Sequence, residues 1–120
     1  MNAVLNYLNK AQAEVRAKNV IAAAGKPAFV LNSLNEYVVI RPLVCADGFQ
    51  ISVQASSTHY CAPRDSQGPW IEVECGFPSE DVPTLAEYKE SDGPDGKSVF
   101  AWTPIELVNE LIASHGGIKE

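Results

Sequence analysis

The stretch YVVIRPLVCADGFQISVQAS (residues 37–56) decides how this chain folds. Its first eight residues form an apolar run rich in β-branched side chains, and Asp47 and Gly48 supply a tight turn. Residues 49–56 then alternate between apolar and polar side chains, the two-residue period of a strand with one buried face. Strand, Asp-Gly turn and strand together predict an antiparallel hairpin. Pro42 has no N–H to donate to a neighbouring strand, so we place it at an edge or a bulge.

Two further strands are predicted towards the C-terminus. The sequence WIEVECGF (residues 70–77) alternates, which predicts inward side chains at Ile71, Val73, Cys75 and Phe77. The shorter run VFAW (residues 99–102) also favours a strand. Residues 78–98 are acidic and interrupted by Pro and Gly, so they predict an exposed loop with one short helical turn from Thr84 to Glu87.

Helices are predicted at both ends of the chain. Asn2 is placed to cap a helix whose apolar stripe runs to about Lys18. Residues 19–24 and 28–31 then predict short strands around Gly25 and Pro27, and residues 32–36 predict a turn.

The C-terminal helix carries the clearest local pattern, TPIELVNELIASHGG (residues 103–117). Thr103 is the expected N-cap, Pro104 the first helical residue and Glu106 the partner in a capping box. Gly116 and Gly117 are expected to end the helix. The whole order predicts a single α+β domain over residues 1–120, an antiparallel β-sheet with N-terminal and C-terminal helices packed on it.

Charge is distributed unevenly along the 120 residues, whose formal net charge is −6. Residues 1–64 carry six basic against three acidic side chains, whereas residues 65–120 carry three against twelve. Because binding to a phosphate polymer depends on many basic groups, DNA and RNA are not expected partners. A small anion needs only a few local donors and stays possible.

The absence of several sequence motifs leads to our expectations about cellular compartment and cofactors. No segment has the length of a membrane span, and the polar N-terminal residues are unlike a signal peptide. The three cysteines show no C-x-x-C spacing, so we expect reduced thiols in a cytoplasmic protein without a membrane partner. No phosphate-loop, dinucleotide-binding or zinc-protease motif is present, and no cofactor is expected.

The connection STHYCAPRDSQGPW (residues 57–70) concentrates unusual side-chain chemistry between two predicted strands. Connections of this length in compact domains commonly have a function. The alternative is a structural connection whose aromatic side chains close the end of the sheet. Catalysis by Cys61 with His59 as base is weakly indicated, because such pairs usually lie far apart in sequence. A metal site from His59, Cys61, Cys75 and His115 lacks any recurrent ligand spacing.

A pocket for a small nucleotide is favoured over catalysis and metal binding, and it stays open beside the structural alternative. A base stacks on an aromatic face, and a guanidinium binds phosphate. The stacking candidates are Tyr60, Trp70, Phe77 and Trp102, and the phosphate candidates are Arg64 and Arg41. Four polar side chains of the connection are candidates for bonds to sugar hydroxyls: Ser57, Thr58, Ser66 and Gln67.

Two segments, SVQASSTHYCAPRDSQGPWIEVECGFPS (residues 52–79) and SVFAWTPIELVNELIASHGG (residues 98–117), resemble a family of small phage proteins. These are the phage Thoeris anti-defence proteins that act as signal sponges, and by order of elements the similarity covers roughly residues 27–118. The matching motif includes His59, Tyr60, Cys61, Arg64, Trp70, Gly76, Phe77 and Pro78.

The resemblance implies a counter-defence protein that sequesters a cyclic nucleotide immune signal without cleaving it. The implied ligand is the cyclic ADP-ribose isomer of a host TIR-domain enzyme, with cyclic oligonucleotides a further ligand of some members. It also implies a homo-oligomer whose pockets lie where subunits meet, with His59 added to the ligand-binding candidates and with Arg64 and Arg41 supplied by adjacent subunits.

Two rival functions stay open on the sequence. One is a small acidic protein that antagonises a host protein by direct binding through residues 78–98, since acidic patches steer encounter with basic partners. The other is a small hydrolase of the same cyclic nucleotide.

Overall fold

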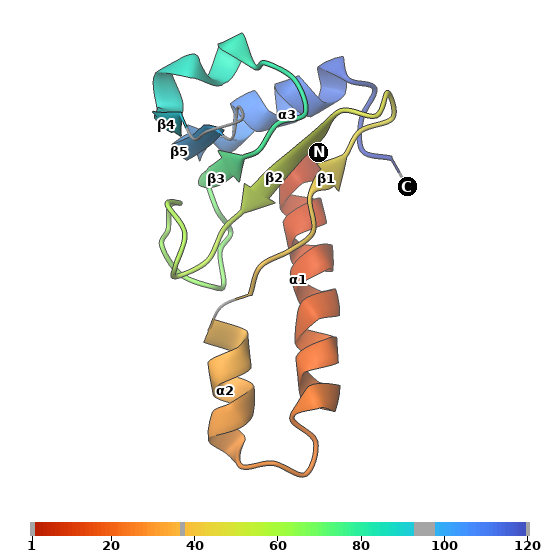
Figure 1. The fold of residues 1–120 in the computed structure, drawn as a ribbon, viewed down its shortest axis with the longest axis vertical. Helices are drawn as coiled ribbons and strands as arrows, with labels where there is room; N and C mark the ends of the chain where they lie inside the picture. The colour runs from red at the N-terminus through yellow and green to blue at the C-terminus, as the bar shows by residue number, and fades with distance from the viewer. Residues whose placement is uncertain (1, 37, 93–97, 120) are drawn as a thin grey trace.

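A computed structural model describes residues 2–36, 38–92 and 98–119 and confirms the α+β class. Five antiparallel strands form one sheet in the order β1-β2-β3-β5-β4, with a helix near each end of the chain (Figure 1). The elements are α1 (Ala3–Ala22), α2 (Ala28–Glu36), β1 (Leu43–Val44), β2 (Gln50–Gln54), β3 (Glu72–Gly76), the 3-10 helix η1 (Pro83–Tyr88), β4 (Lys89–Asp92), β5 (Ser98–Pro104) and α3 (Ile105–Ser114).

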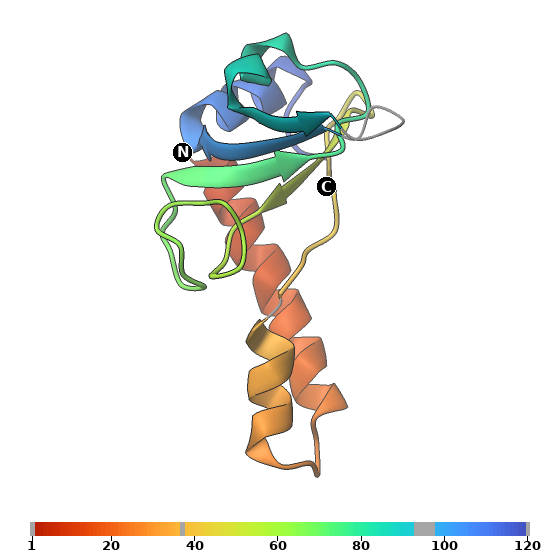
Figure 2. The same cartoon turned by 60° about the vertical axis from the view of Figure 1, so that its left-hand side comes forward.

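The core lies between one face of the sheet and the helices. The first half of α1 and all of α3 cover the same face (Figures 1 and 2). Helices α1 and α3 each bury residues that recur every three or four positions, the period of a helix. The strands bury alternate residues, the period of a strand. The central members are Val4, Leu8, Ile51, Val53, Val73, Val108 and Ile112.

The predicted hairpin is confirmed, with Leu43 opposite Ile51 across the turn. Gly48 has φ +94, which explains why glycine ends the turn. The first strand is shorter than expected, since β1 covers only Leu43–Val44 and Tyr37 lies outside the described residues. Pro42 interrupts the ladder, and the backbone of Ile40 bonds to the side chain of Gln54 instead, through its N–H (3.1 Å) and its carbonyl (2.9 Å).

The two short strands predicted at residues 19–24 and 28–31 are wrong. The Asn2 cap is confirmed, because its side chain accepts the N–H of Leu5, but α1 continues to Ala22. The next segment is α2, which also absorbs the turn predicted at 32–36. Short apolar runs do not distinguish helix from strand, and the alanine-rich end of α1 favours helix. The two helices form a hairpin that extends away from the sheet (Figures 1 and 2).

The C-terminal helix begins later than predicted. Thr103 is not its N-cap, because β5 extends to Pro104 and Thr103 pairs with Val73 of β3. The N–H of Ile105 donates to the carbonyl of Ile71 (2.9 Å), so the sheet occupies the backbone that a cap would need. Helix α3 does end at the predicted glycines, since Gly116 and Gly117 have φ of +88 and +86.

Residues 78–92 contain more regular secondary structure than predicted. The helical turn expected at Thr84–Glu87 is present within η1, where Leu85 is buried, and it is followed by β4, which pairs with β5. Residues 93–97 lie outside the described part of the chain. In β3 the inward pattern holds at Val73 and Cys75, whereas the flanking Ile71 and Phe77 are exposed.

Candidate functional site

Residues 57–70 are fixed to the fold by backbone and side-chain contacts. Ala62 pairs with Glu72, accepting its N–H (3.2 Å) and donating to its carbonyl (3.0 Å). The carboxylate of Asp65 accepts two backbone N–H groups, from Gln67 and Gly68. Arg16 of α1 reaches the same segment and donates to the carbonyl of Ser66 (2.8 Å). These contacts hold the segment in place as a scaffold for exposed side chains.

Trp70 forms the base of this segment and is not an open stacking face. Its side chain is 2% exposed, and its indole N–H donates to the carbonyl of Asp65 (3.0 Å). Gly68 lies directly on the ring, because a Cβ added there would be 2.9 Å from a ring carbon. The sequence prediction of Trp70 as a ligand contact is therefore corrected: the ring belongs to the core.

Trp102 is turned out of strand β5 by a β-bulge. The pairing of β3 with β5 places Val73 opposite Thr103 and Cys75 opposite Phe100, so Glu74 opposes two residues, one of them Trp102. Trp102 has φ +46, a left-handed conformation that costs an L-residue about 1–2 kcal/mol. Bulges of this kind redirect a side chain, and they recur beside functional sites.

The bulge brings Trp102 against Tyr60, and Arg64 lies near the same tyrosine ring. We call these three residues the Tyr60 cluster. The two rings stack at 5.0 Å between centroids with an interplanar angle of 30°. The N–H of Trp102 donates to the carbonyl of Tyr60 (3.0 Å), and Cζ of Arg64 lies 5.4 Å from the centroid of the Tyr60 ring. Tyr60 and Trp102 are 40% and 42% exposed, so two aromatic rings and a guanidinium face solvent together.

A small groove, which we call the sheet groove, has a volume of about 190 Å³. Its lining residues come from the sheet and from its flanking segments: Val39, Ser52, Gln54, His59, Glu74, Cys75, Gly76, Phe77 and Val99. Glu74 links the groove to the Tyr60 cluster, because its Oε2 accepts the N–H of Tyr60 (2.8 Å). Phe77 is exposed at the groove and, like Trp102, has a left-handed backbone, with φ +52.

His59 lines the sheet groove as an uncharged group. Its Nδ1 lies 2.6 Å from Oγ of Ser56, which also contacts the hydroxyl of Thr58. Burial lowers the pKa of His59, and the nearby Glu74 carboxylate opposes that effect. A neutral imidazole supplies one donor or acceptor to a ligand but adds no positive charge.

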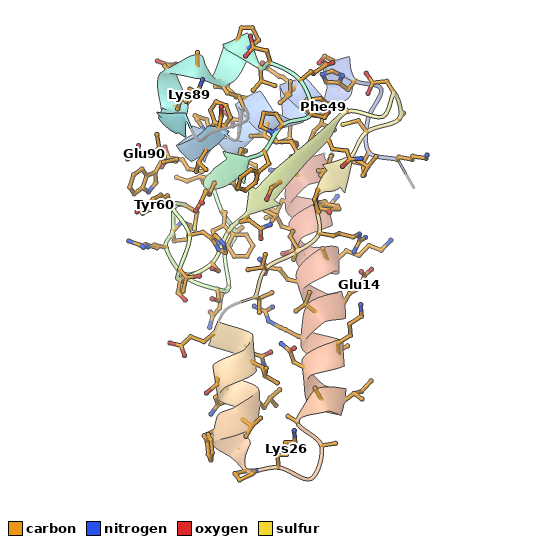
Figure 3. All side chains as sticks on the ribbon, in the orientation of Figure 1. Glu14, Lys26, Phe49, Tyr60, Lys89 and Glu90 are labelled. Atoms are coloured by element: carbon orange, nitrogen blue, oxygen red, sulfur yellow. The ribbon has the colours of Figure 1, made fainter. Side chains whose placement is uncertain are left out.

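Arg41 does not join the Tyr60 cluster. Its guanidinium pairs with Glu14 of α1 (2.7 Å) and lies 5.7 Å from the ring centroid of Tyr7. Figure 3 places Glu14 and Tyr60 on opposite sides of the molecule. Within one chain, Arg64 and Arg41 cannot clamp one phosphate group.

The side chains considered for catalysis or metal binding do not converge. Cys61 is buried, its thiol contacts the carbonyls of Ser56 and Pro63, and burial raises its pKa. His115 instead stacks on Phe49 and contacts Asp47 at 2.6 Å. Within residues 2–36, 38–92 and 98–119, no group of three His, Cys, Asp or Glu side chains is placed to hold a metal ion.

Of the seven predicted ligand-binding residues, the structure brings three into the Tyr60 cluster and two, His59 and Phe77, to the sheet groove. Glu74 was missed, although its outward position in the alternation of residues 70–77 was visible in the sequence. Arg16 was also missed, because nothing in the sequence connects a helical arginine to a loop 50 residues away.

Comparison with protein-family models, curated proteins and solved structures gives no match for this chain. No helix in the described ranges combines the length and apolarity that crossing a bilayer requires.

Proposed function

We propose that this chain binds a small nucleotide-like ligand at the Tyr60 cluster and the sheet groove, and holds it without cleaving it. The conformation and exposure of Trp102 are the observation that supports this proposal. A strained backbone presents its indole to solvent, stacked on Tyr60, and the Arg64 guanidinium lies near the same tyrosine ring. Backbone strain of this kind clusters where a protein recognises a ligand.

The exposed groups match the parts of a nucleotide. A base stacked on Tyr60 or Trp102 gains about 1–3 kcal/mol. Arg64 offers a planar set of donors to a phosphate oxygen. Glu74 accepts hydrogen bonds from a ribose hydroxyl or an amino group, and neutral His59 supplies one more polar atom at the groove.

Size favours a ligand that extends beyond the groove. At about 190 Å³ the sheet groove is smaller than the roughly 300–1,000 Å³ of typical small-molecule sites. A ligand with a base and two phosphates therefore fits when one part occupies the groove and the rest lies across the Tyr60 cluster. The specific ligand we propose is a cyclic ADP-ribose isomer, sequestered as an immune signal during phage infection.

Binding without cleavage is supported by the state of the nearby reactive groups. The thiol of Cys61 has a raised pKa, which disfavours the thiolate that a nucleophile requires. His59 contacts the hydroxyl of Ser56, and because Ser56 is only 1% exposed, this hydroxyl cannot reach a ligand.

The experiment is a fluorescence titration of a Trp70→Phe variant, in which Trp102 is the remaining tryptophan. The probes are cyclic ADP-ribose isomers, linear ADP-ribose and cyclic dinucleotides, with mass analysis of the bound molecule after heating. We expect quenching by a cyclic ADP-ribose isomer and its recovery unaltered. Recovery of an altered molecule would identify a hydrolase, and no quenching by any probe would refute the proposal.

A matched pair of arginine variants tests the site. We expect Arg64→Ala to weaken binding at least tenfold, about 1.4 kcal/mol. Arg41→Ala is the control, because that arginine is exposed and pairs with Glu14 on the other side of the molecule. Equal losses in the two variants would show that Arg64 does not determine binding within its own chain, as expected if net charge or Arg41 of an adjacent subunit contributes equally.

A second candidate is direct antagonism of a basic host protein. A groove of about 570 Å³ favours it, lined by the carboxylate residues Glu80 and Asp81 together with apolar Val82 and Phe100. Reversal of both charges, Glu80→Lys with Asp81→Lys, should abolish protein binding in this case and leave small-molecule binding unchanged.

A further inference from the structure

A groove of about 500 Å³ lies where the start of α1 meets the C-terminal segment, and we call it the C-terminal groove. Ala3, Tyr7 and Lys10 line it from α1, at spacings of three and four that place them on one side of the helix. Its volume is within the roughly 300–1,000 Å³ of typical small-molecule sites, and it shares no lining residue with the sheet groove. This groove is therefore a second candidate site, separate from the first.

Hydrogen bonds hold the other two segments of the groove against α1 and β1. The hydroxyl of Tyr7 donates to the carbonyl of Arg41 (2.7 Å), which fixes the segment before β1 to the helix. The N–H of Lys119 donates to the carbonyl of Val44 (2.8 Å), so the C-terminal segment lies along β1 (Figure 1). The groove is thus formed by hydrogen-bonded segments that are far apart in the sequence.

Positive charge is concentrated at this groove. Lys10, Arg41 and Lys119 line it from three different segments. Glu14 pairs with Arg41 (2.7 Å), but neither lysine forms an ion pair with another described residue. The groove therefore has an excess of two positive charges, in a chain whose formal net charge is −6. An anion bound between these groups offsets their mutual repulsion.

Apolar surface lies next to these charges. Tyr7 and Ile118 are half-buried, each packs against the core, and both line the groove. A ligand that matches both features has an anionic group and an apolar body.

We propose that the C-terminal groove binds a small phosphate monoester with an apolar body. A phosphate carries nearly two negative charges and balances the two excess positive charges, whereas a carboxylate balances only one. The planar donors of Arg41 bind two phosphate oxygens, and Lys10 and Lys119 add point charges. The apolar body packs on Tyr7 and Ile118. This site does not depend on the proposed nucleotide binding at the Tyr60 cluster.

The ion pair between Arg41 and Glu14 competes with the ligand. Both side chains are exposed, 59% and 45%, and an exposed pair is weak enough for a phosphate to replace. Loss of the Glu14 charge should therefore tighten phosphate binding, an effect that a purely structural role of this pair would not produce.

Calorimetry with butyl phosphate tests the class of ligand. This probe has no ring to stack on Tyr60, and butanesulfonate supplies a monoanion of the same chain length. At about pH 8 the phosphate carries nearly two negative charges, and we expect it to bind about fivefold more tightly than the sulfonate. Equal affinities would refute a phosphate site.

Charge-matched variants test the position of the site. Lys10→Gln should weaken the binding of butyl phosphate about fivefold, whereas Lys26→Gln, an exposed lysine at the tip of the helical hairpin, should leave it unchanged. Glu14→Gln should strengthen binding about fivefold, and Glu36→Gln, an exposed carboxylate of α2, should not. Equal effects within either pair would show that net charge alone determines binding and would overturn the proposal.

Arg64→Ala distinguishes this groove from the Tyr60 cluster. We expect this variant to bind butyl phosphate as the unmodified chain does. Loss of binding in Arg64→Ala without loss in Lys10→Gln would place the phosphate at the Tyr60 cluster and overturn the second site. Unchanged amide NMR signals of Tyr7 and Lys119 on addition of butyl phosphate would overturn it as well. Probe and readouts differ from the fluorescence titration of Trp102, so either proposal can fail while the other stands.

Discussion

Because the backbone at Trp102 is strained, we predict that glycine at this position is more stable than alanine, the reverse of what a strand normally shows. We compare Trp102→Gly with Trp102→Ala. Both variants lose the ring pair with Tyr60, worth about 0.5–1.5 kcal/mol, so that loss cancels between them. What remains is the backbone, which has φ +46 at this position.

The magnitude follows from two opposing contributions. Alanine in the left-handed region retains a cost of about 1–2 kcal/mol, which glycine does not have. Glycine loses more conformational entropy on folding, which costs about 0.5–1 kcal/mol relative to alanine. We therefore expect the free energy of unfolding of Trp102→Gly to exceed that of Trp102→Ala by about 0.5–1 kcal/mol.

The assay is guanidinium unfolding followed by circular dichroism and by the fluorescence of the buried Trp70. Val99 is the matched control, since it lies in the same strand and is not among the positive-φ residues. There the order should reverse, with Val99→Gly less stable than Val99→Ala by about 0.5–1 kcal/mol. If glycine were the less stable variant at both positions, the backbone at Trp102 would not be strained and the main support for the proposed site would be lost.

Two further predictions concern the core. Burial raises the pKa of the Cys75 thiol to about 12, so its contribution to stability is complete below pH 9, where the unfolded chain keeps its proton, and is lost as the pH rises towards 12. Between those values we expect Cys75 to lower the free energy of unfolding by about 1.4 kcal/mol per pH unit. Cys75→Ala should reduce the pH dependence measured in urea titrations by that amount, leaving the smaller part that Cys45 and Cys61 contribute, and an unchanged slope would contradict the assignment. Gly68→Ala should destabilise the fold more than Gly25→Ala does, because both have positive φ but only the Gly68 Cβ meets a ring, 2.9 Å away; equal melting temperatures would show that Trp70 moves aside.

The sequence was informative where one local rule decides the structure. The Asp47–Gly48 turn and the Asn2 cap each depend on neighbours in the chain, and both predictions are confirmed. The alternation of residues 49–56 holds from Phe49 to Val53 but fails at its end, because Gln54 and Ser56 are buried. The sequence prediction failed at residues 19–36, where short apolar runs suit strand and helix equally, and tertiary context decides. The prediction of Thr103 as the N-cap was wrong for a related reason, because pairing with Val73 across the sheet competes with helix capping.

The site was predictable by residue type but not by arrangement. An exposed and a buried tryptophan look alike in sequence, and what separates Trp70 from Trp102 is a contact with Gly68 and a bulge opposite Glu74. Arg41 looked equivalent to Arg64, yet Glu14 comes close to it only through the packing of α1. Each of these distinctions depends on residues far apart in the chain.

The contribution of Phe77 and Trp102 to folding does not fully offset their backbone strain, even with the ring pair between Trp102 and Tyr60. Both have left-handed backbones, where glycine is favoured, and both expose about half of their surface, 56% and 42%, so little burial offsets the strain. Phe77 directly follows β3 and lines the sheet groove, whereas Trp102 lies in the paired strand β5 and stacks on Tyr60. Glu74 connects the two places through the backbone of Tyr60. Two strained, half-exposed aromatic rings, one in β5 and one directly after β3, therefore support the ligand site that we propose.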